Sequence, residues 1–147
     1  MTTEPVVVEQ LYHASGSLVW SALTEKDRLR KWYFEVSDFK PEVGFEFHFT
    51  AGTENTKWLH LCKVTEVVPL KKIAYSWRYD RYPGISHVSF ELFEDKGKTR
   101  VRVTHTGIET FPQDDDSFAR SNFQAGWKAI LGEALQKYVG DMAGSVK

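Results

Sequence analysis

Apolar residues recur at three- and four-residue spacing through the C-terminal part of the chain, from Ser117 to about Ala143. This spacing places them on one broad face and predicts a long amphipathic helix. We expect Asp116 or Ser117 to cap its N-terminus. The predicted face consists of Phe123, Trp127, Ile130, Leu131, Ala134, Leu135, Tyr138 and Met142. A helix with so wide an aromatic face needs a large apolar surface to pack against.

Most of the chain before this helix consists of segments in which apolar and polar residues alternate, which is the pattern of half-buried strands. The first strand is predicted at Val6–Tyr12 and is followed by two short helices. The first helix begins near Ser15 or Ser17, and the second is capped by Thr24 and covers Glu25–Trp32. Five further strands are predicted at Phe45–Phe49, Trp58–Val68, Ile73–Tyr79, His87–Phe93 and Thr99–His105.

Turn-forming residues join these later strands directly, as at Asp95-Lys96-Gly97, which predicts a hairpin turn. Consecutive strands with short connections form an antiparallel meander. The predicted order of elements is therefore β-α-α-β-β-β-β-β-α, an α+β fold with its helices on one side of the sheet. No linker, repeat or low-complexity tract interrupts the pattern, so we expect one domain over residues 1–147.

The overall composition narrows the kind of partner. The 147 residues are 41% hydrophobic and 27% charged, and their formal net charge is -1. A nearly neutral chain is not expected to bind nucleic acid or an anionic membrane non-specifically. No apolar run approaches the length of about 18 residues that spans a bilayer, and the N-terminus lacks the features of a signal peptide. We therefore expect a cytoplasmic protein.

Several short sequences occur in an order that is characteristic of one known family. They are Trp20, Lys31-Trp32, Val43-Gly44, Val67-Val68-Pro69 ahead of Ile73–Arg78, Lys98–Val101 followed by Thr104–Gly107, and Gly126-Trp127 followed by Leu131 and Leu135. From roughly Val7 to Val139 the chain resembles the family of activator of heat-shock-protein-90 ATPase homologues. That family lies within the START/birch-pollen-allergen superfamily of helix-grip proteins.

The resemblance implies a helix-grip fold, in which a curved antiparallel sheet wraps around the long C-terminal helix. Related helix-grip proteins bind sterols, lipids, polyketides or plant hormones between the sheet and the helix, and only some of them are enzymes. The chaperone activators of the family carry a separate N-terminal domain, for which we expect no room in this chain. The resemblance therefore implies a stand-alone member of the family.

We predict that the protein binds a small, largely apolar molecule between its sheet and its C-terminal helix. Aromatic residues make up 14% of the chain, and they suit a rigid cavity wall as well as a packed core. Those two arrangements use the same residues and stay open at this stage. The predicted ligand-binding residues are Tyr75, Trp77, Phe90, His105, Phe123 and Trp127.

Sequence motifs for catalysis or metal binding are weak. His105 is in phase with Val101 and Val103, so it is the strongest candidate for orienting a ligand or acting as a base. His48 and His60 are expected to lie opposite each other on paired strands, where they either share a metal or simply face solvent. Cys62 is a candidate nucleophile, but a buried, unreactive thiol explains it better. Asp114-Asp115-Asp116 is a candidate calcium site, but a solvated acidic turn at a helix N-terminus explains it better. We therefore predict no catalytic residue, no metal and no cofactor.

Two alternatives to a binding protein remain. The first is a co-chaperone-like module that contacts a heat-shock-protein-90-type ATPase through exposed aromatic and charged residues. Its candidate patch consists of Trp58, Tyr79, Arg81 and Tyr82. The second is a pocket enzyme for a condensation, cyclisation or dehydration, with His105 or a tyrosine as its acid or base.

Overall fold

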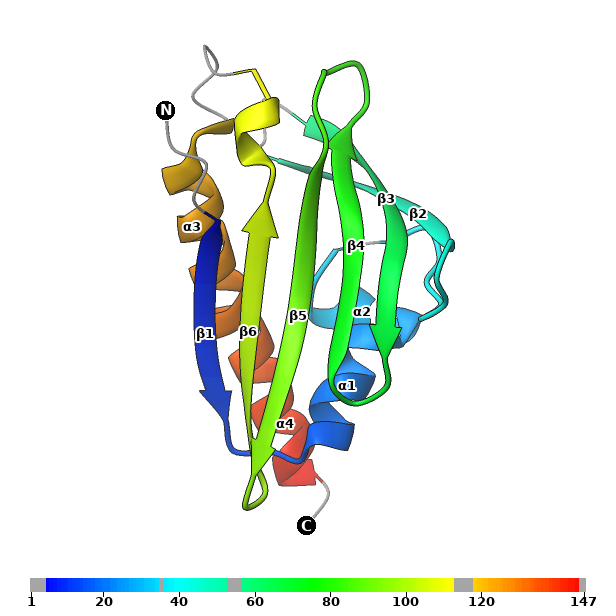
Figure 1. Ribbon diagram of the computed structural model, residues 1–147. Coiled ribbons are helices and arrows are strands. Elements are labelled where there is room, and N and C mark those ends of the chain that lie inside the picture. Colours follow the sequence, from blue (N-terminus) through cyan, green and yellow to red (C-terminus); the bar gives the residue numbers. More distant parts are fainter. Residues whose placement is uncertain (1–4, 35, 53–56, 113–117, 146–147) are drawn as a thin grey trace.

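The computed structural model describes residues 5–34, 36–52, 57–112 and 118–145, and it has the α+β architecture that the sequence predicts (Figure 1). The elements are β1 (Val6–Tyr12), α1 (Gly16–Thr24), α2 (Lys26–Trp32), β2 (Glu46–Gly52), β3 (Lys57–Val68), β4 (Lys72–Tyr79), β5 (Ser86–Asp95), β6 (Lys98–Thr106), a 3₁₀ turn (Ile108–Thr110), α3 (Arg120–Ala129), a π-helical segment (Ile130–Leu135) and α4 (Gln136–Ser145). The C-terminal helices run behind a curved open sheet.

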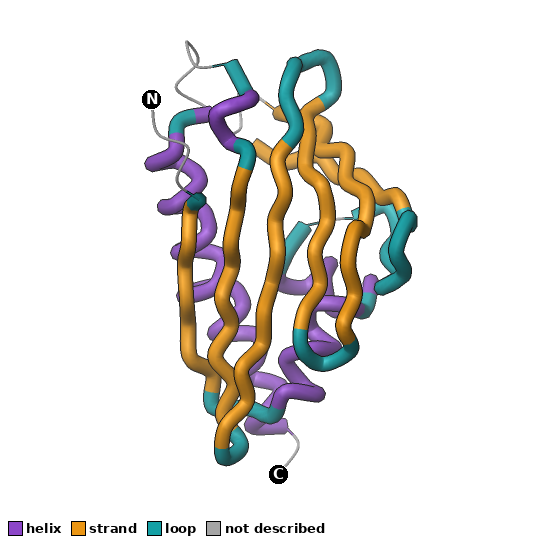
Figure 2. The backbone as a smooth tube through the Cα atoms, in the orientation of Figure 1, coloured by secondary structure: helices purple, strands orange, loops and turns teal. Residues whose placement is uncertain are grey.

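The six strands form one antiparallel sheet in the order β1-β6-β5-β4-β3-β2. Strands β2 to β6 make the predicted meander, and β1 joins it at the far edge by pairing with β6, with Val6 opposite His105. The helices α1 to α4 lie on the same side of this sheet (Figure 2). The helix-grip fold is therefore confirmed. No helix of the described residues is both long and apolar enough to cross a membrane.

Alternation along the strands decides which side chains face the helices. On β6, Thr99, Val101, Val103 and His105 point inward and are buried. The inward position of His105 is therefore confirmed. The strand register corrects the prediction for the other histidine pair, because His48 lies opposite Leu61 and His60 lies opposite Phe49. Adjacent register positions face opposite sides of a sheet, so His48 is exposed and His60 is buried.

The expected N-cap is found at α1, whereas α2 and α3 are preceded by Glu25 and Ala119 instead of the expected cap residues. Ser15 caps α1 as expected, by accepting a hydrogen bond from the Leu18 amide at 3.2 Å. Thr24 does not cap α2, because it is the last residue of α1 and its hydroxyl donates to the Trp20 carbonyl at 2.8 Å. Helix α3 begins at Arg120 after Ala119. The expected caps Asp116 and Ser117 lie outside the described residues.

The long C-terminal helix is widened by its π-helical segment, where backbone hydrogen bonds shift from the usual spacing. The Tyr12 hydroxyl, from strand β1, donates a 2.8 Å hydrogen bond to the Leu131 carbonyl of this segment. Tyr12 and Leu131 are both fully buried. This bond joins the first strand to the middle of the last helix.

Replacing Tyr12 with Phe should lower the free energy of unfolding by about 1–3 kcal/mol, because it leaves the buried Leu131 carbonyl without that donor. Urea denaturation measures the change. Tyr82→Phe is the matched control, since Tyr82 is 38% exposed, and it should stay within about 0.5 kcal/mol of the natural chain. A Tyr12→Phe variant as stable as the control would show that the buried bond contributes nothing.

Candidate functional site

A pocket of about 300 Å³ lies between the concave face of the sheet and helix α3. It opens beside Asn122 and Gly126, which are both exposed. Most of its lining side chains are aromatic. The lining consists of Phe34, Ala51, Trp58, His60, Trp77, Tyr79, Phe118, Asn122, Phe123, Gly126, Trp127 and Ile130. The sheet and the helix therefore do not interdigitate completely here, and the aromatic residues that flank the gap form walls.

Two different periodicities bring these residues together. On the sheet, Trp58 and His60 alternate along β3 and Trp77 and Tyr79 alternate along β4, so that all four point to one face. Antiparallel pairing sets His60 directly opposite Tyr79. The α3 residues of the lining follow helical spacing and form a single stripe of that helix.

Phe34 reaches the pocket from the irregular segment between α2 and β2. Its ring stacks on Phe49 at 4.4 Å between centroids, with an angle of 7° between the planes. Phe49 in turn stacks on the His60 ring at 4.5 Å and 13°. The Phe34 and His60 rings also lie 6.2 Å apart, so the three rings form one compact cluster with nearly parallel planes.

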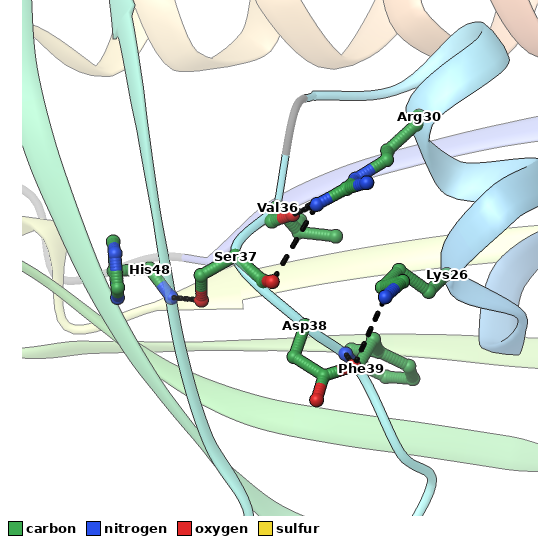
Figure 3. A network of polar contacts seen from close by, with 7 residues as sticks. All are labelled: Lys26, Arg30, Val36, Ser37, Asp38, Phe39 and His48. Carbon is green, nitrogen blue, oxygen red and sulfur yellow. Dashed lines mark hydrogen bonds and ion pairs between the residues drawn. The ribbon is translucent and has the colours of Figure 1, made fainter.

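The segment that follows Phe34 is held by a network of polar contacts (Figure 3). The Arg30 guanidinium of α2 donates to the Val36 carbonyl at 3.0 and 3.1 Å. Ser37 binds the backbone of His48 on β2, accepting from its amide at 3.1 Å and donating to its carbonyl at 2.8 Å. Helix α2 and strand β2 are thereby tied to this segment, which fixes the part of the chain that presents Phe34.

His60 is the histidine of the lining, and its burial lowers its pKa from 6.5 to about 4. The ring is therefore neutral at physiological pH. Its Nδ1 lies 3.0 Å from the Trp58 carbonyl. A carbonyl can only accept, so the neutral ring carries its proton on Nδ1 and leaves Nε2 as an acceptor. His60 therefore lines the pocket as a neutral group rather than as a charge.

His105 lies beside the pocket in a chain of hydrogen bonds that runs from the Trp127 indole to the Trp77 carbonyl. The Trp127 indole N–H donates to His105 Nδ1 at 3.1 Å, so the His105 proton is on Nε2. That nitrogen donates to the Ser86 hydroxyl oxygen at 2.7 Å, and the Ser86 hydroxyl donates to the Trp77 carbonyl at 3.0 Å. Burial, with a smaller contribution from His87, lowers the pKa of His105 to about 3. Both ring nitrogens are occupied, and the ring orients Trp127.

His105→Phe should therefore cost about 2–4 kcal/mol of folding free energy, since it removes the partners of the Trp127 indole and the Ser86 hydroxyl. Urea denaturation measures this loss. The emission maximum of the folded variant should also shift, because the Trp127 indole loses its acceptor. His87→Phe, at an exposed position of β5, is the control. Equal stability of the two variants would contradict the orienting role of His105.

The structure separates the predicted ligand-binding residues into two groups. Trp77, Phe123 and Trp127 line the pocket. Tyr75, Phe90 and His105 are buried beside it and lie outside its lining. The Tyr75 hydroxyl is 2.8 Å from the hydroxyl of Tyr33, and Phe90 packs edge-on against Trp127 at 5.7 Å. Lining residues outside the predicted set include Phe34, Trp58, His60, Tyr79 and Phe118.

The other candidate sites from the sequence find less support. Tyr79 is only 6% exposed, so it is not part of an exposed patch with Arg81 and Tyr82, and Trp58 lines the pocket. Cys62 is buried and its pKa is raised by burial, as expected of an unreactive thiol. Within the described part of the chain, no three His, Cys, Asp or Glu side chains gather as they would around a metal ion. Asp114-Asp115-Asp116 lies outside that part.

Comparison with solved structures shows the same fold in bacterial proteins. Protein MLL2253 from Mesorhizobium loti is 26% identical, with a TM-score of 0.75 over 94% of this chain and 98% of that one. CalU16 from Micromonospora echinospora is 22% identical, with a TM-score of 0.69, and the match covers 95% of this chain and 78% of CalU16. DynU16, a putative protein in the dynemicin biosynthetic locus, is 19% identical, with a TM-score of 0.76. That match covers 95% of this chain and 48% of DynU16.

No curated protein matches the sequence. A family model does match, over residues 13–140, and its description is Activator of Hsp90 ATPase homolog 1-like protein. The matched range runs from the residue after β1 into α4 and includes all the residues that line the pocket. The chain therefore belongs to the Activator of Hsp90 ATPase homolog 1-like protein family.

Proposed function

We propose that this protein binds a small, largely apolar molecule with an aromatic ring system in the pocket between the sheet and helix α3. The observation that carries the proposal is the gap of about 300 Å³ with aromatic side chains on both of its walls. A void of about 150 Å³ lined by apolar side chains accommodates a benzene molecule. The pocket is therefore suited to about two fused rings with a short substituent.

The aromatic walls supply the binding energy in this proposal. The Trp77 and Trp127 rings, from β4 and α3, have centroids 5.7 Å apart and planes inclined at 60°. Phe123 adds a further ring from α3. Burial of apolar surface contributes about 25 cal/mol per Å², and offset or edge-on ring contacts add about 0.5–1.5 kcal/mol each. For a ligand of thirteen or so non-hydrogen atoms, we expect a Kd on the order of 10 μM.

The titratable groups of the lining support binding rather than acid–base catalysis. His60 has a pKa of about 4, and burial raises the pKa of Tyr79 to about 12. Neither value lies near neutral pH, where a general acid or base works best.

We also propose that residues 1–147 fold as one domain, because β1 pairs with β6 and contacts α3. A cytoplasmic location stays part of the proposal on the strength of the sequence.

Titration with 2-isopropenylnaphthalene, an uncharged hydrocarbon with two fused rings, tests the proposal. Binding should quench the emission of the pocket tryptophans Trp58, Trp77 and Trp127 with a Kd on the order of 10 μM. Mass spectrometry of the gently purified protein, followed by solvent extraction, should identify the class of the natural ligand. Absence of quenching up to the solubility limit of the hydrocarbon would contradict the proposal.

A further inference from the structure

The outer face of the sheet carries a second concave region, which we call the outer groove. Figure 1 shows this face toward the viewer, with the helices behind it. The groove has a volume of about 370 Å³ and crosses strands β2, β3 and β4. The outward-facing side chains that these strands bring to its lining are Glu46, His48, Leu61, Lys63, Ser76 and Arg78. The sheet itself therefore separates the outer groove from the aromatic pocket on its concave face.

Strand register places the two permanent cations of the outer groove close together. Arg78 of β4 lies opposite Leu61 of β3, and Lys63 follows Leu61 by two residues on the same face. Lys63 and Arg78 are therefore diagonal neighbours, about 7–8 Å apart. His48 of β2 also lies opposite Leu61, on the side away from Arg78. An anion above Leu61 is within reach of all three polar side chains.

Neither Lys63 nor Arg78 forms an ion pair with a described residue. Other basic residues of the same sheet face do have acidic partners. Glu9 pairs with both Arg100 and Arg102 where β1 meets β6. Two neighbouring cations without a partner repel each other, and an anion bound between them would relieve this repulsion. The outer groove is therefore the part of this face where positive charge is left uncompensated.

Ser76 and Glu46 complete the polar part of the outer groove. Ser76 is only 9% exposed although it belongs to the outer face, so it lies at the bottom of the groove. Its hydrogen bond to the Lys63 carbonyl is long, at 3.4 Å, and the hydroxyl can turn to donate to an anion instead. Glu46 lies opposite Lys63 and opposes anion binding, but its single negative charge does not cancel the two cations.

We propose that the outer groove binds a small phosphate monoester, held mainly by Lys63 and Arg78. A phosphate group carries a charge of about −1.5 to −2 at pH 7 and three acceptor oxygens, which suit two cations and the Ser76 hydroxyl. The guanidinium of an arginine also matches phosphate with two parallel hydrogen bonds. The half-buried Leu61 and the exposed Ile85 offer an apolar surface to the organic part of the ester. This site is separate from the aromatic pocket, and the inference does not rest on the function proposed for that pocket.

Titration with phenyl phosphate at low ionic strength, followed by amide NMR spectroscopy, tests the inference. We expect saturable shifts at Lys63, Ser76 and Arg78 with a Kd of about 0.1–1 mM. Inorganic phosphate should bind about threefold more weakly, because it lacks the ring that covers Leu61. Arg78→Gln and Lys63→Gln should each weaken the binding of phenyl phosphate about tenfold. Glu46→Gln should strengthen it about threefold, because it removes a like charge.

Arg81→Gln and Lys71→Gln are the matched controls, since they remove the same charges from exposed positions outside the lining of the outer groove. Both should bind phenyl phosphate like the natural chain. Absence of saturable binding by the natural chain would overturn the inference, and so would equal weakening by the groove and control variants. Binding to vesicles that contain phosphatidic acid, without binding to phenyl phosphate, would identify a lipid headgroup and overturn the free ester. The uncharged hydrocarbon tests the aromatic pocket separately, so either proposal can fail alone.

Discussion

Gly126→Leu should weaken the binding of 2-isopropenylnaphthalene by at least about tenfold while leaving the fold at least as stable. Gly126 lies on α3 in the lining of the pocket, and a Cβ atom built there meets nothing within 4 Å. A leucine side chain therefore fits without a clash at its base and extends over the pocket opening. Leucine also favours a helix by up to about 1 kcal/mol relative to glycine. Loss of binding together with unchanged or higher stability is the expected result.

Gly140→Leu is the control for this substitution. Gly140 lies on α4, is exposed, and likewise has nothing within 4 Å of an added Cβ atom. It should gain similar stability and bind the hydrocarbon like the natural chain. Fluorescence titration and urea denaturation of both variants measure the two effects. Equal binding by Gly126→Leu and Gly140→Leu would place the ligand elsewhere on the protein.

Acidification from pH 7.5 to pH 5 should lower the free energy of unfolding by about 4 kcal/mol. Burial lowers the folded-state pKa of His60 to about 4 and that of His105 to about 3, from 6.5. Above pH 6.5 both residues are neutral in the folded and unfolded states, so their full stability is present there. As the pH falls below 6.5, the unfolded chain binds protons that the folded protein excludes. At pH 5 each residue therefore costs about 2 kcal/mol.

Urea denaturation at the two pH values measures this loss. His60→Phe should remove about half of the pH dependence, because a neutral ring replaces the buried imidazole. His48→Gln, at an exposed position of the neighbouring strand, should leave the dependence as it is in the natural chain. An unfolding free energy that is constant between pH 7.5 and pH 5 would show that neither buried histidine resists protonation.

The sequence was sufficient to predict the fold because its two periodicities are clear. The alternation over Thr99–His105 matches β6, and the helical spacing from Phe123 onward matches the C-terminal helix, which runs from α3 through the π-helical segment into α4. The boundary between the two short helices could not be predicted from the sequence, since a threonine hydroxyl can bond a carbonyl of its own helix, as Thr24 does, as well as cap the next helix. The pairing of β1 with β6 follows from tertiary packing, which leaves no local signal in the sequence.

The candidate site could be predicted only in part. The inward direction of His105 was predictable from its phase with Val103, but its place outside the pocket lining was not. That place depends on Trp127, whose indole N–H binds the histidine ring. Phe34 comes from an irregular segment that has no periodicity to indicate its direction. The side chains of His60 and Tyr79 depend on the register between β3 and β4, and shifting this register by one residue would turn each of them to the other face.

The central claim is that a ligand occupies the aromatic pocket, and NMR spectroscopy of the indole N–H groups tests it most directly. The chain has five tryptophans. Trp58, Trp77 and Trp127 line the pocket, whereas Trp20 lies on α1 and the Trp32 indole donates to the Ala22 carbonyl at 2.8 Å. Titration with 2-isopropenylnaphthalene should shift the three pocket signals and leave those of Trp20 and Trp32 in place. Pocket signals that stay unchanged at saturation, or shifts confined to Trp20 and Trp32, would contradict the account.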